Sequence, residues 1–291
     1  MSAAISRTRG RIGPLLLTLT AVVSPALAGP LTPEEALKTF ELADPNLEIE
    51  LVASEPAIED PVAMAFDEYN RLYVVEMRGF QQGEDAKGIP GVGRVSRLED
   101  RDGDGRYETS TVYADGMYYP TAVVPAYGGI VVGCSPDILW FKDTDGDGKA
   151  DERRVLWTGF GTGNHEQLVN SFQWGIDGWI YAASGGSGGQ VRPGDQPNAK
   201  PISIGSRNFR FRISPDGRPV AFETLSGGGQ YGLTCDDAGR WLTCSNARHI
   251  IQIILPESYL ARNPYLAVSQ VAADVSDHGP AAKIARISPF E

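Results

Sequence analysis

Residues 170–186 read NSFQWGIDGWIYAASGG, a pattern that indicates how the chain folds. An apolar strand pattern leads into a Gly-Ile-Asp-Gly turn, and a second, almost continuously apolar strand follows. Three further segments have the same strand, turn, strand pattern. They are PVAMAFDEYNRLYVVEMRG from Pro61, PTAVVPAYGGIVVGCSPD from Pro120 and QYGLTCDDAGRWLTCSNARH from Gln230.

The repeats predict an all-β chain built as a β-propeller. Self-similarity at this period, without long helices in between, favours propeller blades over a helical solenoid. One blade cannot bury both of its faces, so stacking against neighbours explains why the second strands are apolar on nearly every residue. These strands begin at Leu72, Ile130, Ile180 and Trp241, with spacings of 58, 50 and 61 residues. We therefore expect four to five blades.

The first 28 residues predict a secretory signal peptide. Three arginines precede the apolar run IGPLLLTLTAVV, and Ala26 and Ala28 offer a cleavage site before Gly29. The run is shorter than the roughly 20 residues that cross a bilayer. We expect a periplasmic or secreted protein with no membrane span in this chain.

Two further regions follow the signal peptide. Residues 29–48 predict a short helical segment, because Thr32, Pro33 and Glu35 form a capping-box pattern. Residues 49–291 hold the propeller. No obvious closing strand is seen at the final KIARISPFE, so we expect the propeller to be truncated at its C-terminus.

Charge and cysteine content exclude some functions. The chain has 26 basic and 37 acidic residues, and without the three arginines of the signal peptide the balance is −14. Nucleic acid is excluded as a partner, because its binding draws on clustered Lys and Arg. The three thiols include no Cys-x-x-Cys-His motif, so the chain carries no covalent haem of its own. Cys235 and Cys244 flank a turn, but the inferred register does not place them opposite each other.

Two acidic stretches, EDRDGDGRYE from Glu99 and DTDGDGKADE from Asp143, place acids at alternate positions followed by glycine. Such a loop can direct several carboxylates at one hard cation, so we predict two structural calcium sites. The bidentate glutamate of an EF-hand is missing, and Glu108 and Asp151 are candidates to compensate. A plain acidic hairpin turn is the alternative. The predicted ligands are Asp100, Asp102, Asp104, Asp143, Asp145 and Asp147.

The chain resembles a known family. The segments ELVASEPAIEDPVAMAFDEYNRLYVVEMRGF, GFGTGNHEQLVNSFQWGIDGWIYAASG and QYGLTCDDAGRWLTCSNARHI, with the two Asp-Gly-Asp-Gly turns, are similar to the propeller of the membrane-bound dehydrogenases common in planctomycete and verrucomicrobial genomes. That propeller in turn resembles the six-bladed quinoprotein glucose and sorbosone dehydrogenases. The resemblance implies part of a six-bladed propeller, with pyrroloquinoline quinone (PQQ) and calcium as cofactors.

The resemblance assigns a role to His165. In the quinoprotein enzymes a histidine precedes a segment like NSFQWGIDGWIY and acts as general base, taking the hydroxyl proton while hydride passes to the quinone. Arg207 and Asn208 match the Arg-Asn pair of those enzymes only superficially, because the surrounding motif is absent. An ordinary loop histidine is the alternative interpretation.

Propeller geometry suggests further site residues. Residues just past the second strands should converge on one face of the molecule. The predicted cofactor-binding or substrate-binding residues are Glu76, Arg78, Asp137, Asn164, Asn246, Arg248 and His249.

Two functional hypotheses follow. The first is an exported quinoprotein-type dehydrogenase that oxidises a sugar or other alcohol and passes electrons to a cytochrome c domain or protein. The second is a non-catalytic, calcium-stabilised propeller that binds a glycan or a partner protein. A lactonase is a weaker third idea, because no nucleophile or full catalytic metal set is seen.

Overall fold

The computed structural model describes residues 29–80, 91–263, 265, 267–268 and 270–275. The predicted signal peptide and the final KIARISPFE segment lie outside the described residues. The chain forms two compact units, which divide between Glu50 and Leu51. In the first unit, helix α1 (Pro33–Leu37) begins with the expected capping box, in which the Thr32 hydroxyl accepts from the amide of Glu35 and the Glu35 carboxylate accepts from the amide of Thr32.

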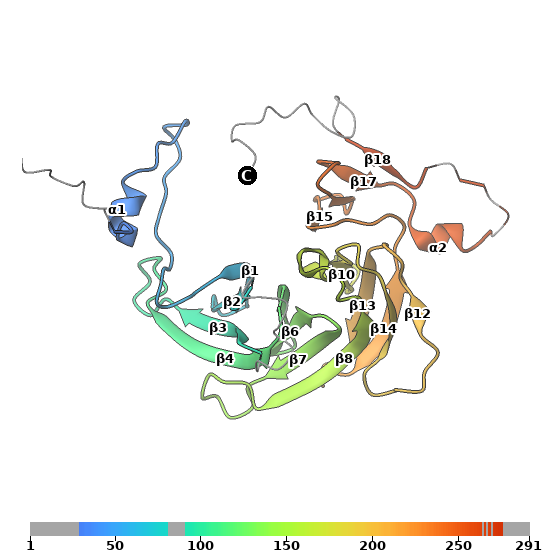
Figure 1. Cartoon of the computed structure of the whole chain (residues 1–291), viewed down its shortest axis with the longest axis horizontal. Coiled ribbons are helices and arrows are strands. Elements are labelled where there is room, and N and C mark those ends of the chain that lie inside the picture. The colour runs from blue at the N-terminus through green and yellow to red at the C-terminus, as the bar shows by residue number, and fades with distance from the viewer. Residues whose placement is uncertain (1–28, 81–90, 264, 266, 269, 276–291) are drawn as a thin grey trace, which may run out of the picture. The chain divides into compact units, whose positions relative to one another are not determined.

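The second unit is a β-propeller of four antiparallel sheets, as predicted (Figure 1). Blade 1 consists of β1 (Pro61–Phe66), β2 (Leu72–Glu76), β3 (Gly93–Glu99) and β4 (Thr109–Met117). Blade 2 consists of β5 (Ala122–Ala126), β6 (Gly129–Cys134), β7 (Asp137–Lys142) and β8 (Glu152–Phe160). Blade 3 consists of β9 (Asn170–Trp174), β10 (Ile180–Ala183), β13 (Phe209–Ile213) and β14 (Pro219–Thr224). Blade 4 consists of β15 (Leu233–Cys235), β16 (Trp241–Thr243), β17 (Ile251–Ile253) and β18 (Ala272–Asp274).

The first strand of each blade is the inner one. Strand β1 contacts β5, β5 contacts β9, and β9 contacts β15, so these four strands lie next to one another although they are far apart in sequence. Strands β4, β8 and β14 run along the outer side of the blades in Figure 1. The starts of β1, β5, β9 and β15 therefore meet at one end of the blades.

The core lies in the seams between blades. One cluster joins blades 1 and 2, a second joins blades 2 and 3 around Trp140, Phe209 and Phe211, and a third joins blades 3 and 4 around Tyr181 and Leu233. Both faces of blades 2 and 3 are thus covered by a neighbour, which is why β6 and β10 are buried at every residue.

Blade 2 contains strands that the repeat pattern did not predict. After β10 the chain returns to blade 2 and adds β11 (Gly189–Pro193) and β12 (Ile202–Ser203) beyond β8. It then re-enters blade 3 as β13. Besides α1, the described helices are α2 (Glu257–Leu260) and the 3-10 turn η1 (His165–Gln167).

The cysteines are free thiols. Cys235 pairs with Trp241 in the β15–β16 register rather than with Cys244, in agreement with the inferred register. Burial raises the pKa of the Cys134 thiol to about 11, so this buried thiol stays protonated and unreactive at neutral pH.

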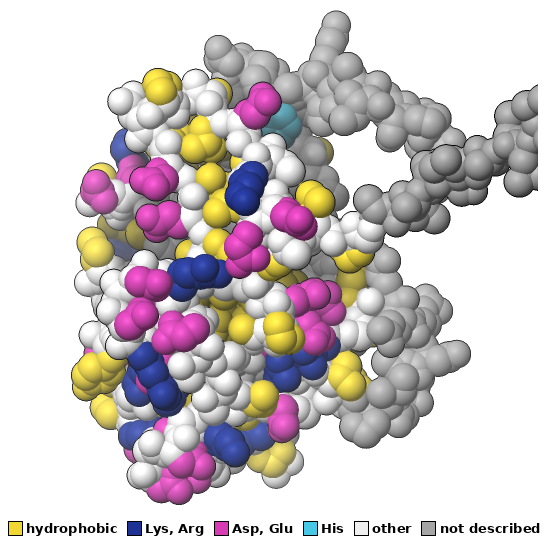
Figure 2. All heavy atoms as spheres, turned by 90° about the vertical axis from the view of Figure 1, so that its left-hand side faces the viewer, with side chains coloured by type: hydrophobic (Ala, Val, Ile, Leu, Met, Phe, Trp, Pro, Cys, Tyr) yellow, Lys and Arg dark blue, Asp and Glu magenta, His cyan; other side chains and the backbone are white. Residues whose placement is uncertain are grey.

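No helix within the described residues is long and apolar enough to cross a membrane. On the face shown in Figure 2, dark-blue basic side chains are interspersed with magenta acidic ones. This mixture differs from the clustered basic surface that a polyanion requires.

Candidate functional site

A cavity of about 540 Å³ lies where blades 1 and 4 and the η1 turn come together. Its walls are the residues around the start of β1, the end of β2, the start of β15 and the end of β16. In an antiparallel hairpin the start of the first strand and the end of the second share one end of the sheet, so both sets face the same space. The lining residues are Asp60, Pro61, Val62, Met77, Phe80, His165, Glu166, Gln230, Tyr231 and Asn246.

His165 enters this cavity because of a short capped turn. Asn164 is the N-cap of η1, and its side-chain oxygen accepts from the amide of Glu166 at 2.9 Å. The two residues that follow the turn, Leu168 and Val169, are buried and hold it in place. The Thr121 hydroxyl also donates a hydrogen bond to the carbonyl of Val169 at 2.5 Å. Asn164 therefore shapes the loop that presents His165.

The imidazole of His165 is held by its ring face. Its centroid lies 4.4 Å from that of Tyr119, with the ring planes tilted by 30°, and Phe80 meets Tyr119 edge-on at 6.3 Å. Among the described residues, no hydrogen-bond or ion-pair partner occupies either imidazole nitrogen. The ring is thus oriented by stacking, and its two nitrogens are available to a ligand.

Three of the five described non-glycine residues with positive φ lie at or near this cavity, and the other two, Asn70 and Tyr127, lie in hairpin turns. Asp60, which lines it, has φ of 49°, and Tyr119, which holds His165, has φ of 48°. Ser171, beside the buried Asn170, has φ of 56°. A non-glycine residue in this region costs of order 1–3 kcal/mol and persists only where the surroundings impose it. Such strain is characteristic of ligand sites.

Asn170 ties blade 3 to the cavity wall of blade 4. Its fully buried amide donates to the carbonyls of Leu168 at 2.9 Å and Gln230 at 2.8 Å, and it accepts from the amide of Gly232 at 3.1 Å. Gln230 in turn accepts from the amide of Asn246 at 3.2 Å. One buried side chain thereby positions the segment that supplies Gln230 and Tyr231.

The sequence-predicted site residues divide into two groups. His165 and Asn246 line the cavity, and Asn164 caps the turn that carries His165. The other predicted residues do not line it. Asp137 is half-buried at the start of β7, Arg248 donates to Asp274 at 2.7 Å, and His249 is exposed just before β17.

Glu76 and Arg78 belong to a buried ion-pair network rather than to the cavity wall. The Glu76 carboxylate is fully buried and accepts from Arg94 at 2.9 Å, from Arg78 at 3.0 Å and from the Ser96 hydroxyl. Arg78 also pairs with Glu59 at 2.6 Å.

Several residues of the site were missed by the sequence analysis, although a signal for them exists. Asp60, Tyr119 and Gln230 each stand at or directly before the start of a repeated segment. The prediction rested on the residues after the second strands, but the residues before the first strands lie at the same end of the sheet.

The two acidic loops each gather three carboxylates. Oxygens of Asp100, Asp102 and Glu108 lie within 4.8 Å of one another, as do those of Asp143, Asp145 and Asp151. Asp104 and Asp147 are not in these clusters and instead accept from the amides two residues further on. Each loop thus offers oxygen ligands of the kind that hard cations prefer.

Comparison with known proteins places the chain in a family. Residues 32–290 match the model of a domain of unknown function, DUF7133. The chain belongs to the DUF7133 family. No curated protein matches it.

The DUF7133 chain is also similar to several solved structures. For an oxidoreductase of Thermus thermophilus described as a glucose dehydrogenase, identity is 17%, the TM-score is 0.41, and 64% of this chain and 57% of that chain are covered. For the PQQ domain of a pyranose dehydrogenase from Coprinopsis cinerea, identity is 14%, the TM-score is 0.39, and 67% of this chain and 44% of that chain are covered. For a gluconolactonase of Xanthomonas campestris, identity is 18%, the TM-score is 0.36, and 62% of this chain and 52% of that chain are covered. The chain thus spans between 44% and 57% of the length of these three proteins.

The described cavity of the DUF7133 chain does not fit PQQ. This cofactor is a polyanion with several carboxylates, so its binding calls for free cationic side chains. The charged residues that line the cavity are the acids Asp60 and Glu166, and neither has an ion pair with a described residue. The arginines expected at the site, Arg78 and Arg248, are already paired with carboxylates.

Proposed function

We propose that this DUF7133 propeller acts on a sugar or another alcohol, with His165 as the base that takes the proton of a substrate hydroxyl. The observation that carries the proposal is the state of the imidazole. It is an exposed ring that stacks on Tyr119 and lines the cavity, while its nitrogens have no described protein partner. Imidazole is the side chain whose ordinary proton exchange falls near neutral pH, which suits this task.

The other lining groups support a hydroxyl-rich substrate. The Asp60 and Glu166 carboxylates can accept hydrogen bonds from hydroxyl groups, and the Asn246 side chain can both donate and accept. Phe80 and Tyr231 offer aromatic surface against which the carbon face of a sugar ring can pack. A neutral or positively charged substrate suits this wall better than an anionic one.

The quinoprotein resemblance adds the reaction type to the proposal. Oxidation of the hydroxyl requires an acceptor for the hydride as well as a base for the proton. Because the described cavity does not fit PQQ, the hydride is proposed to pass to a two-electron acceptor that binds separately, a role that the dye fills in the assay. Export by residues 1–28 and a cytochrome c as final electron acceptor remain part of the proposal, on the strength of the sequence pattern and the resemblance.

The experiment compares wild type with His165→Gln, which keeps hydrogen bonding but cannot exchange a proton near neutral pH. Dye reduction by a panel of aldoses and polyols is followed with and without PQQ and calcium. We expect turnover to fall about 10²–10⁴-fold in His165→Gln with KM little changed. Asn198→Ala, an exposed position outside the cavity, serves as control.

Two outcomes would contradict the proposal. Unchanged turnover in His165→Gln would show that His165 is not the base. Sugar binding without turnover, with or without PQQ, would instead support the calcium-stabilised binding propeller.

Calcium is proposed as a structural ion at the two acidic loops. Each cluster lies in the hairpin connection that follows a third strand, β3 or β7, and the loop glycines at positions 103, 105, 146 and 148 have positive φ. A bound cation would screen the repulsion among the carboxylates and stiffen the connection.

A further inference from the structure

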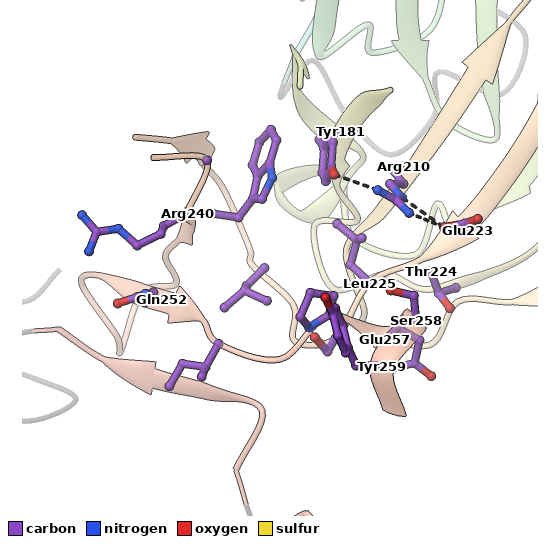
Figure 3. A pocket seen from close by; sticks show the side chains of 16 residues that line it. Tyr181, Arg210, Glu223, Thr224, Leu225, Arg240, Gln252, Glu257, Ser258 and Tyr259 are labelled. Carbon is purple, nitrogen blue, oxygen red and sulfur yellow. Dashed lines mark hydrogen bonds and ion pairs between the residues drawn. The ribbon is translucent and has the colours of Figure 1, made fainter. Parts of the chain in front are cut away.

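A second cavity, of about 410 Å³, lies in the seam between blades 3 and 4 (Figure 3). Strands β10, β13 and β14 form one wall, and β16, β17 and α2 form the other. It has no residue in common with the cavity of His165.

The repeat shows that Trp241 occupies an unusual position. The corresponding residues that begin or nearly begin the second strands of blades 1 to 3 are the aliphatic Leu72, Ile130 and Ile180, exposed by 2% or less. In blade 4 the residue is a tryptophan, only partly buried, and it stacks on Tyr181 with ring centroids 3.8 Å apart. Trp241 packs against the seam cluster around Tyr181 and Leu233 and also lines the cavity, whereas an aliphatic side chain fills this position in the other three blades. Blade 4 thus differs from the others in giving the seam an aromatic wall.

Every charged side chain that lines this cavity is already paired. Figure 3 shows Arg210 bound to Glu223, at 2.7 Å, and to the Tyr181 hydroxyl, at 2.9 Å, and Arg210 also pairs with Asp177 at 2.9 Å. The two other pairs are Arg240 with Asp236 at 2.6 Å and Glu257 with Arg207 at 3.3 Å. Neither an anionic nor a cationic ligand would find a free counter-charge among the described residues.

The polar groups without a partner are neutral. The Gln252 amide and the hydroxyls of Thr224 and Ser258 make no hydrogen bond with any described residue. Leu225 and Ile253 add apolar side chains to the lining. A few uncommitted neutral donors and acceptors, set among apolar and aromatic surface, form a binding site for a ligand that is itself neutral and rich in hydroxyl groups.

We propose that this seam is a carbohydrate-binding site for a neutral oligosaccharide, separate from the cavity of His165. Trp241 and Tyr259 would pack against the carbon faces of sugar rings, and Gln252, Thr224 and Ser258 would bind their hydroxyl groups. A lipid tail would leave these polar groups unpaired, which disfavours an alkyl ligand. The exposed ring of Tyr259 lies at the rim, where a chain of more than one sugar leaves the cavity.

Calorimetric titration with maltotetraose, cellotetraose and laminaritetraose tests the proposal, with oligogalacturonate and chitosan tetramers as anionic and cationic comparisons. We expect at least one neutral tetrasaccharide to bind more tightly than either charged one. Tyr259→Ala should weaken that binding about fivefold to tenfold, in line with the loss of one aromatic contact. Gln252→Leu should weaken it about threefold to tenfold through the lost amide hydrogen bonds.

Matched controls separate the site from general effects of the substitutions. Tyr69 is exposed on blade 1 and has Arg71 over its ring at 5.0 Å, as Tyr259 has Arg262 at 4.9 Å, so Tyr69→Ala should leave binding unchanged. Gln173→Leu on β9 is the control for Gln252→Leu. His165→Gln should lower turnover about 10²–10⁴-fold without reducing this binding, so failure of the proposed function and failure of this site are distinguishable. No binding of neutral tetrasaccharides, tighter binding of a charged one, or binding insensitive to Tyr259 and Gln252 would overturn the proposal.

Discussion

Glu76 illustrates at the scale of one residue how buried charge serves this fold. Burial raises the pKa of its carboxyl group, but the hydrogen bonds from Arg94 and Ser96 outweigh that effect and hold the pKa below its usual value. The charged form is therefore the native one. The network joins β2 to β3 and, through the amide of Glu59 at 3.0 Å, to the segment before β1.

Glu76→Gln should lower the free energy of unfolding by about 2 kcal/mol at pH 7. This is less than the roughly 3–5 kcal/mol for breaking a fully buried pair, because Arg94 and Arg78 retain some access to water. Urea denaturation measures the loss. Glu59→Gln, at a partly exposed carboxylate that also pairs with Arg78, should change stability by less than about 1 kcal/mol.

The pH dependence of the same variant gives an independent check. A lowered folded pKa means that the Glu76 carboxylate stabilises the fold at pH above its unfolded value of about 4.3, and that this contribution is lost as the pH falls through the folded value. The difference in unfolding free energy between wild type and Glu76→Gln should therefore shrink on acidification below about pH 4.3. A difference that grows in acid would contradict the role assigned to this carboxylate.

The sequence was informative about single residues where a local pattern carries the signal. His165 was predicted from the resemblance to the quinoprotein enzymes, and the structure places it with Asn246 on the cavity wall, while the predicted Asn164 caps the turn that carries it. The stacking of Tyr119 on His165 was not predictable, because it joins the loop after β4 to the loop after β8 and depends on the relative placement of blades. The ion pairs of Arg78 and Arg248 with carboxylates could not be predicted from the sequence for the same reason.

At the scale of elements, turn glycines do more than reverse the chain. Gly217 and Gly178 both follow an aspartate in a hairpin turn, with φ of 69° and 73°. A Cβ on Gly178 would meet nothing within 4 Å, whereas one on Gly217 would overlap the ring of Trp140 in the neighbouring blade. The β13–β14 turn is therefore also a contact between blades 3 and 2.

This pair of glycines allows backbone strain and steric overlap to be separated. Gly178→Ala should cost about 1 kcal/mol, from positive φ alone. Gly217→Ala should cost about 3 kcal/mol, because overpacking against the buried Trp140 adds to the same strain. Thermal and urea unfolding of the two variants provide the comparison. Equal losses of stability in the two variants would show that the Trp140 ring moves aside for the added Cβ at no energetic cost.

The acidic loops lead to a second prediction about elements. Calcium should raise the melting temperature, and a site saturated at 100 times its Kd adds about 2.7 kcal/mol. The Asp143 loop should bind more weakly than the Asp100 loop, because Arg97 lies 3.7 Å from Asp143 and competes with a cation. Asp100→Asn should therefore remove more of the calcium-dependent gain than Asp143→Asn. A melting temperature insensitive to calcium and to chelator would favour the plain acidic turn.

Most strands were predictable from the sequence, but the addition of β11 and β12 to blade 2 was not. Leu72, Ile180 and Trp241 begin β2, β10 and β16 as expected, and β6 begins one residue before Ile130. Local apolar patterns and turn residues determine these boundaries. The return of β11 to pair with β8 depends on hydrogen bonds between segments separated by a whole hairpin, and a repeat pattern contains no signal for such pairing.

At the scale of the whole propeller, the blades are joined by buried asparagines as well as by apolar seams. Asn170 connects blade 3 to the segment before β15, and Asn208 accepts from the amide of Gly229 at 2.9 Å. Both are fully buried. Because the Asn170 contacts fall on Gln230 and Gly232, the geometry of the His165 cavity depends on how blade 4 is attached to blade 3.

Asn170→Ala should therefore loosen blade 4 selectively. Loss of its buried hydrogen bonds leaves the Gln230 carbonyl and the Gly232 amide without a partner, at a cost of about 2–3 kcal/mol. Hydrogen exchange should accelerate in residues 230–235 and 241–243 more than in β6 or β7, because the connection between blades opens before the blades themselves unfold. Asn198→Ala, at an exposed position without side-chain hydrogen bonds to described residues, should leave exchange unchanged. Uniform acceleration across all four blades would mean that the propeller opens as one unit and that Asn170 is no selective link between blades 3 and 4.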